Sequence, residues 1–346
     1  MAVTMETEGK GLERNLAICG IQARYIGGTE APQMFRFEFE MIQPAKITAI
    51  KNAVELLRNY FGDYQYDDTP SGKGFAIIRP FDKPTPVYLG NAAQEIKKAR
   101  DADPNGEQKA YICLGKDIYS NYIIKNMDKC KSILIAGTSG SGKSVLLNSL
   151  IMQLLCFSNA NLILIDPKDG AEFGIYEKDI HNRIGGIAKN TAEAVKQLKW
   201  ALDIMQSRFA KMGNDYQKTY DGERLVVVID ELAELMAENK NEVTPIIERI
   251  AAKGRAAGVH LIIATQVPYI SVLGGKVKYN MQTKVCLKTA NMQHSKNIID
   301  VDKGADLLGY GDAYLKFEDN PNLIRAQTPY VSDEEIINCI TGKNDK

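Results

Sequence analysis

The sequence lacks the features that mark secreted, membrane-spanning and zinc-binding proteins. Its six cysteines include no CxxC pair, and no stretch approaches the roughly 18 consecutive apolar residues that a transmembrane helix needs. The start of the chain has no apolar core of a signal peptide, and the three histidines show no metal-ligand spacing. These absences predict a cytoplasmic chain with free, buried thiols in a reducing compartment and without zinc.

An excess of charge of either sign is also missing. Lys plus Arg and Asp plus Glu are equal at 43 each, so a polyanion such as DNA would have to be met by a local basic patch. At 346 residues, 45% of them hydrophobic, the chain is long enough for two globular domains of about 100–200 residues each.

The first third of the chain has the pattern of a small mixed domain. Phe35, Phe37 and Phe39 alternate with charged residues, and this period of two places the aromatic rings on one face of a strand. Apolar residues recur at steps of three and four over residues 47–61, which predicts an amphipathic helix. Residues 74–80 (GFAIIRP) predict a second strand.

The pattern changes after the polar segment 98–109, which we expect to be a surface loop or a linker. Beyond it, short apolar runs typical of buried strands alternate with helical stretches. The strand-like runs are residues 132–136, 161–165, 225–229 and 260–265. Apolar strands alternating with helices predict an α/β fold with a parallel sheet covered on both faces. We expect a small α+β domain over residues 1–120 and this α/β domain over residues 121–346.

A phosphate-binding loop is predicted at residues 137–144, which match GxxxxGK[ST] between an apolar strand and an apolar helix. Glycines let backbone N–H groups surround a phosphate at the helix N-terminus, Lys143 adds positive charge, and the Ser144 hydroxyl suits Mg²⁺. The predicted nucleotide-binding residues are Gly137, Thr138, Ser139, Gly140, Ser141, Gly142, Lys143, Ser144 and Val145. The alternative, a chance glycine-rich turn, is disfavoured by the flanking strand and helix.

Polar residues that suit hydrolysis follow two of the predicted strands. Asp230 and Glu231 end the run at 225–229, and carboxyl ends of parallel strands share one edge of a sheet. Asp230 is predicted to hold Mg²⁺ and Glu231 to orient the attacking water. Gln266 follows the run at 260–265 and is predicted to sense the γ-phosphate. The alternatives are a helix cap for the acidic pair and a solvated loop residue for Gln266.

Four further segments carry a resemblance to a known family. The segments are DPKDGAEF (166–173), DELAELM (230–236), KGRAAGVHLIIATQVP (253–268) and DLLGYGDAYL (306–315). In order and spacing they resemble the signatures of the FtsK/SpoIIIE motor, and the first third more weakly resembles the small domain that precedes it. The resemblance implies a RecA-like P-loop NTPase that uses ATP and Mg²⁺, with six copies in a ring around double-stranded DNA and ATP sites between subunits.

Ring assembly gives Arg255 a predicted role as a finger that reaches a neighbour's γ-phosphate. The alternative is an ordinary arginine at a helix C-terminus. The family usually has arginines in the segment matching residues 281–300, where this chain has Lys284 and Lys296. Because lysine cannot make a bidentate guanidinium contact, any finger role for that segment is in doubt.

DNA contacts are predicted in the segment 269–280, which has paired glycines and presents Lys276 and Lys278 beside Tyr279. There the lysines would grip phosphates without reading bases. The alternative is a solvated loop that happens to carry two charges. Residues 181–183 are a second, weaker candidate for a DNA-contacting loop.

The hypothesis that best joins these observations is an ATP-driven translocase of double-stranded DNA that acts as a homo-hexamer. Two alternatives stay open: a conjugation-coupling or secretion-type ATPase of the same superfamily, and a nucleotide-gated DNA-binding scaffold. No membrane helix or winged-helix domain of longer family members is predicted in the sequence. The chain is therefore a minimal translocase or a piece of a longer protein, which leaves membrane tethering open.

Overall fold

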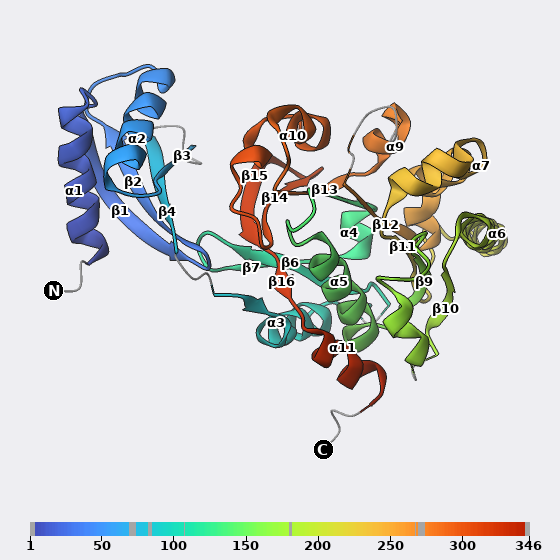
Figure 1. Cartoon of the computed structure of the whole chain (residues 1–346). Coiled ribbons are helices and arrows are strands. Elements are labelled where there is room, and N and C mark those ends of the chain that lie inside the picture. The colour runs from blue at the N-terminus through green and yellow to red at the C-terminus, as the bar shows by residue number, and fades with distance from the viewer. Residues whose placement is uncertain are drawn as a thin grey trace. The chain divides into compact units, whose positions relative to one another are not determined.

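The computed structural model describes residues 4–68, 74–81, 85–106, 108–179, 182–266, 268 and 274–342. The chain divides into two compact units, each described by itself (Figure 1). The first comprises Met1–Pro86 with Lys116–Asn121, and the second comprises Val87–Gly115 with Tyr122–Lys346. The main division thus falls at Pro86, whereas the sequence suggested a boundary near residue 120. The difference arises because the segment after Pro86 contributes Ala92, Ile96 and Ile112 to the core of the second unit.

The first unit is a four-stranded antiparallel sheet with two helices packed on it. Its elements are α1 (Met5–Ile18), β1 (Ala23–Ala31), β2 (Met34–Met41), α2 (Ile47–Phe61), β3 (Gln65–Asp68) and β4 (Gly74–Pro80), in the strand order β1-β2-β4-β3. Phe37 and Phe39 are fully buried against α2, as the alternation in β2 predicts. On the charged face of β2, Arg36 is fully buried and pairs with Glu38 and Asp67, whereas Glu38 is partly exposed and Glu40 is exposed.

A ten-stranded sheet forms the second unit, in the order β10-β9-β11-β12-β8-β13-β14-β15-β6-β7. The strands from β10 to β13 are parallel, and β14 and β15 extend the sheet with antiparallel pairing. The strands are β6 (Tyr111–Asp117), β7 (Tyr122–Asn126), β8 (Ile133–Ala136), β9 (Asn161–Ile165), β10 (Ile184–Ala188), β11 (Leu225–Ile229), β12 (Val259–Thr265), β13 (Thr283–Leu287), β14 (Asp312–Phe317) and β15 (Asn320–Gln327). The predicted α/β class and its four buried strands are confirmed.

Helices cover both faces of the parallel strands. The elements outside this sheet are β5 (Val87–Tyr88), α3 (Leu89–Asp101), α4 (Met127–Cys130), α5 (Lys143–Phe157), α6 (Thr191–Asn214), α7 (Leu232–Lys253), α9 (Gly275–Asn280), α10 (Met292–Ile299), β16 (Pro329–Tyr330) and α11 (Asp333–Ile340), with short 3₁₀ turns at Gly174–Lys178, Gly254–Ala257 and Lys303–Asp306. One face packs against α3, α5 and α11, and the other packs against α6, α7 and α9. Within β8, Ile133 and Ile135 face the first group and Leu134 faces the second, because side chains alternate along a strand.

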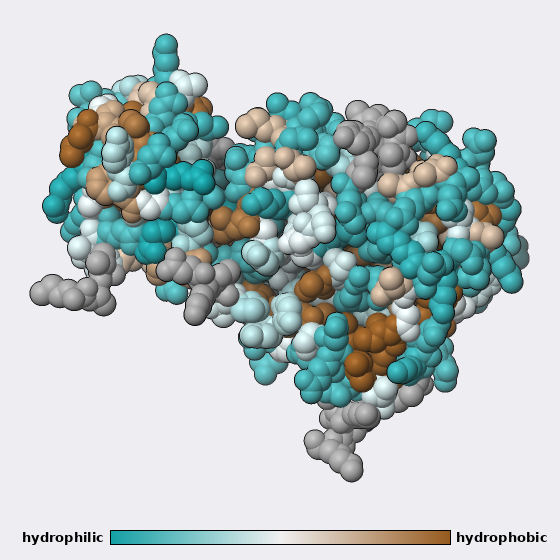
Figure 2. Space-filling model, in the orientation of Figure 1, coloured by the Kyte–Doolittle hydropathy of each residue, from teal (hydrophilic) through white to brown (hydrophobic). Residues whose placement is uncertain are grey.

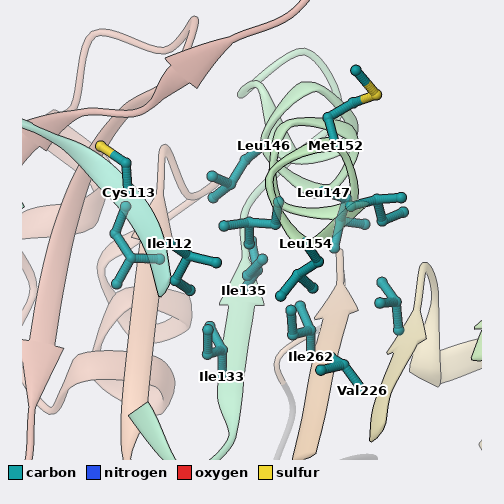
Figure 3. Close-up of a cluster of buried hydrophobic side chains, with 14 of the residues drawn as sticks. Ile112, Cys113, Ile133, Ile135, Leu146, Leu147, Met152, Leu154, Val226 and Ile262 are labelled. Carbon is teal, nitrogen blue, oxygen red and sulfur yellow. The ribbon is translucent and has the colours of Figure 1, made fainter. Parts of the chain in front are cut away.

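The helix α5 is apolar almost all round because it lies between the sheet and other helices. Its side chains contact the strands directly, and Figure 3 shows Leu154 pointing from α5 toward the strands that carry Ile135 and Ile262. Polar groups in this helix have partners in the protein. The amide of Gln153 accepts the backbone N–H of Cys113 at 2.5 Å and donates to the carbonyl of Cys113 at 3.2 Å. The phosphate-loop helix is therefore tied to the sheet by burial and by hydrogen bonds.

Two helices extend beyond the ranges that periodicity predicts. The expected loop at 98–109 begins inside α3, which continues to Asp101. Helical periodicity over residues 243–257 marks only the later part of α7, which begins at Leu232 and bends at Asn239. In the described ranges no helix combines the length and the apolarity needed to cross a lipid bilayer. The face in Figure 2 is mainly hydrophilic, with apolar side chains in separate small areas.

Candidate nucleotide-binding site

The glycine-rich loop follows the central strand β8 and leads into α5. Since β12 and β13 flank β8, their carboxyl ends lie beside the loop. The Gly137 N–H points to the carbonyl of Thr265 at 3.4 Å, and the Thr138 N–H donates to the carbonyl of Lys288 at 2.9 Å. The loop is thus anchored to both neighbouring strands at the sheet edge where ligands of parallel α/β proteins bind.

The far end of this loop rests on the glycine-containing segment at residues 306–315. Gly142 has a φ of +100°, which favours glycine, and a Cβ atom there would lie 2.7 Å from the backbone nitrogen of Gly311. The Gly311 N–H donates to the carbonyl of Ser141 at 2.8 Å. The later glycine segment therefore supports the phosphate loop, a role that the sequence did not indicate.

Lys143 and Asp230 form a buried ion pair at the carboxyl ends of β8 and β11. The Lys143 Nζ donates to Asp230 Oδ1 at 2.9 Å and to the Asp230 carbonyl at 3.1 Å. Their side chains are only 6% and 5% exposed, so solvent screens this ion pair very little. The predicted phosphate-binding lysine and the predicted Mg²⁺ carboxylate thus meet, although 87 positions separate them in sequence. Ser144, in the first turn of α5, supplies a hard hydroxyl oxygen of the kind that Mg²⁺ prefers.

Glu231 is tied to the end of β12 by several hydrogen bonds. Its Oε1 accepts the Thr265 hydroxyl at 2.8 Å, and its Oε2 accepts the Gln266 N–H at 3.0 Å. The same carboxylate caps α7 by accepting the Ala233 N–H at 3.3 Å. Glu231 is therefore a helix cap, as the alternative reading of the sequence has it, but the same carboxylate also binds the end of β12 at Thr265 and Gln266. These contacts hold the carboxylate at the carboxyl ends of the parallel strands, where the glycine-rich loop also lies.

A third carboxylate lies beside the phosphate loop and was not anticipated. Glu172, in the loop after β9, accepts the Asn148 amide at 2.7 Å, and Asn148 lies one turn after Ser144 on α5. Burial and then the negative charge of Asp230 raise its pKa. A signal existed in the sequence, because Asn148 is a polar residue one helical turn after Ser144 in a mainly apolar helix.

The other predicted functional residues lie away from this cluster. Arg255 is exposed and precedes β12, so a strand about 20 Å long separates it from Gln266 at ~3.3 Å per residue. Lys276 is exposed on α9, whereas Lys278 donates to Asp300 at 2.8 Å. Asp300 also binds Lys316 at 2.8 Å and lies 4.0 Å from Lys284.

The two segments predicted to contact DNA, residues 181–183 and 269–280, are described by the structure only in part. Arg183 donates to the carbonyls of Leu155 and Ser158 and so caps the C-terminal end of α5. This contact occupies a side chain that the sequence suggested for DNA. His181 and residues 269–273 lie outside the described ranges.

Comparison with known proteins identifies the family. The family model described as "FtsK/SpoIIIE family" matches residues 95–223 and 215–270, which include the phosphate loop, the acidic pair and Gln266. The chain belongs to the FtsK/SpoIIIE family. The family resemblance inferred from the sequence motifs is thereby confirmed.

Curated FtsK/SpoIIIE relatives are similar to the chain over nearly all of its length. The DNA translocase FtsK of Caldanaerobacter subterraneus subsp. tengcongensis is 33% identical across 95% of this chain and 48% of that protein. The DNA translocase SftA of Bacillus subtilis is 30% identical across 96% of this chain and 36% of that protein. The chain therefore spans about half or less of the length of these relatives.

Solved structures show the P-loop ATPase fold common to this family and to more distant ones. The conjugation coupling protein TcpA of pCW3, in a monomer form with ATPγS, superposes with a TM-score of 0.67 at 23% identity and covers 95% of this chain and 96% of that one. The cytoplasmic domain of the type VII secretion ATPase EccC of Thermomonospora curvata gives 0.61 at 22% identity, covering 75% and 34%. At these identities the likeness concerns the fold.

Proposed function

We propose that this chain is the motor portion of a double-stranded DNA translocase, which hydrolyses ATP with Mg²⁺ as a homo-hexameric ring in the cytoplasm. Family membership supports the reaction class, and the buried contact between Lys143 and Asp230 carries the proposal for this chain. That contact brings the charge for a γ-phosphate and a carboxylate for Mg²⁺ to one edge of the sheet.

The proposed chemistry is divided among residues at this edge. Backbone N–H groups of residues 137–142 bind the phosphates, and Ser144 and Asp230 would hold Mg²⁺, which neutralises phosphate charge when it is bound. Lys143 would exchange its contact with Asp230 for phosphate oxygens. Glu231 would orient the attacking water, and its hydrogen bonds to the strand end would report the phosphate state to Gln266.

The segment that follows Gln266 would transmit the change in nucleotide state to the lysines that contact DNA. The next described elements are Pro268 and α9, which carries Lys276 and Lys278. Lys276 is exposed and suits a phosphate contact, while DNA phosphates would compete with Asp300 for Lys278. Arg255 lies at the opposite sheet edge, so a finger role would have to be played in a neighbouring subunit's site.

ATP hydrolysis with and without duplex DNA tests the enzymatic part. We expect stimulation by DNA at low salt, loss of nucleotide binding in Lys143→Ala, and retained binding with stalled turnover in Glu231→Gln. Glu234→Gln is the matched control, because Glu234 is partly exposed in the first turn of α7 and pairs with Lys168. Normal turnover in Glu231→Gln would remove the assignment of the water-orienting carboxylate.

Triplex displacement tests movement and separates the alternatives. A translocase strips a third strand from duplex DNA only with ATP, whereas a nucleotide-gated scaffold binds without displacement. A secretion-type ATPase would show neither DNA stimulation nor displacement. In DNA binding, Lys276→Ala should reduce the slope of log K against log salt by about one, and Lys253→Ala, an exposed lysine at the other sheet edge, should leave it unchanged.

A further inference from the structure

A row of hydrogen-bonded side chains leads away from the phosphate loop, beyond the residues used above. Ser144 and Asn148 lie one turn apart on the same face of α5. The Asn148 Nδ2 donates to Glu172 Oε1 at 2.7 Å, and the Tyr176 hydroxyl donates to Asn148 Oδ1 at 2.9 Å. Because both ends of the Asn148 amide are used, its orientation is set, and it holds the carboxylate of Glu172 beside Ser144.

The loop that carries Glu172 is built around a buried carboxylate. Asp166 is fully buried at the end of β9, and its Oδ2 accepts the N–H groups of Glu172 at 2.7 Å and Phe173 at 3.0 Å. Phe173 and Tyr176 then anchor the loop in the core. Glu172 is therefore positioned by backbone hydrogen bonds and by packing, unlike a carboxylate on a loose surface loop.

The charges around Ser144 favour a cation. Lys143 pairs with Asp230 in a buried contact, and Glu172 adds a further carboxylate, which Asn148 holds near Ser144. The site thus has more carboxylate groups than Lys143 can pair with. Among the residues that the structure describes, no cluster of three or more His, Cys, Asp or Glu side chains could hold a metal alone. A divalent cation would thus arrive with phosphate ligands, as Mg²⁺ usually does.

We propose that Glu172, which Asn148 holds one turn from Ser144, is a positioning residue for the Mg²⁺ that accompanies the nucleotide and acts on it through Ser144. The inference rests on the proposed function and extends it to a residue outside the phosphate loop and the acidic pair. Outer partners that orient metal ligands typically contribute about 10–100-fold to metal affinity.

The test is the Mg²⁺ dependence of nucleotide affinity in Glu172→Gln. Glutamine keeps the shape and an acceptor for Asn148 but removes the charge. Affinity for a fluorescent ADP analogue is measured by titration in Mg²⁺ and in EDTA. We expect the gain in affinity from Mg²⁺ to fall about tenfold in the variant, with affinity in EDTA within about twofold of wild type. Electron paramagnetic resonance of Mn²⁺ with ADP should show the same loss of bound metal.

Glu177→Gln is the matched control, because Glu177 is five residues along the chain, half exposed, and paired with Lys189. It should keep the full Mg²⁺ effect. An unchanged Mg²⁺ effect in Glu172→Gln would overturn the inference, as would an equal loss in EDTA, which indicates a structural role. If Glu172→Gln does not fold, Asn148→Ala carries the test, since it keeps the charge but releases the carboxylate, and it should lose part of the Mg²⁺ effect. Failure of the wild type to bind the ADP analogue would instead refute the proposed function.

Discussion

Replacing Gly142 with alanine would place a methyl group where the backbone of Gly311 lies. The new Cβ would be 2.7 Å from the Gly311 nitrogen and 3.0 Å from its Cα, and the residue would keep a φ of +100°. Gly311 cannot retreat easily, because its N–H donates to Ser141 and its carbonyl accepts the Thr328 N–H, each at 2.8 Å. The strain therefore falls on the phosphate loop.

The strain energy of Gly142→Ala has two contributions. A positive φ costs a residue with a Cβ about 1–2 kcal/mol, and overpacking against fixed atoms costs about 1–3 kcal/mol more. Gly140→Ala measures the backbone contribution alone, because Gly140 has a φ of +74° but no atom within 4 Å of the position that a Cβ would take. Gly142→Ala should therefore bind nucleotide at least about fivefold more weakly than Gly140→Ala, at 1.4 kcal/mol per factor of ten.

The assay is titration of each variant with a fluorescent ADP analogue, with thermal unfolding measured in parallel. Gly275→Ala serves as the neutral control, because Gly275 has ordinary backbone angles and open space around it. Equal dissociation constants for Gly140→Ala and Gly142→Ala would refute the reasoning, since both residues have a positive φ but only Gly142 lies against Gly311.

Three further predictions concern other parts of the chain. Asp128→Asn should lower the free energy of unfolding by about 3 kcal/mol at pH 7, because it breaks the bidentate pair with the buried Arg224. Burial raises the pKa of Asp128, but the hydrogen bonds from Arg224 and the His260 ring nitrogen 3.3 Å away lower it more, so its contribution exists above about pH 4 and disappears as the pH falls. The difference from wild type should accordingly stay constant above about pH 4 and shrink as the pH falls below that value in chemical unfolding. Arg255→Ala should leave ADP affinity of the monomer unchanged, because Arg255 lies at the sheet edge opposite the phosphate loop. Burial raises the pKa of three thiols to about 12, so Ellman's reagent at pH 8 should label them only after denaturation. These thiols are Cys113, Cys130 and Cys286.

Controls for these predictions are available in the same chain. Asp203→Asn, at an exposed position of α6, should change the free energy of unfolding by less than about 0.5 kcal/mol. A constant difference between Asp128→Asn and wild type across the acid range would argue against the ion pair as its cause. Weakened ADP binding in monomeric Arg255→Ala, or six rapidly labelled thiols in the native protein, would contradict the respective predictions.

Much of the second unit could be predicted because its signals are local. The apolar runs that became β8, β9, β11 and β12 are short and bounded by polar residues, and the phosphate loop is contiguous. The strands β13, β14 and β15 escaped prediction because charged residues interrupt their apolar runs, at Lys284 in β13, at Lys316 in β14 and at Arg325 in β15. The division at Pro86 escaped as well, since the polar segment at 98–109 lies beside a helix that belongs to the larger core.

The sequence by itself determined the α/β class, the phosphate loop with Lys143 and the acidic pair at the end of β11, because each depends on neighbouring residues or on regular spacing. Only the tertiary structure decided which distant groups meet. Tertiary packing brought Glu172 to Asn148 on α5 and Gly311 to Gly142, and it paired Lys278 with Asp300. The physical reason is that side-chain periodicity encodes which face of an element is buried, whereas strand order and loop paths depend on the packing of the whole chain.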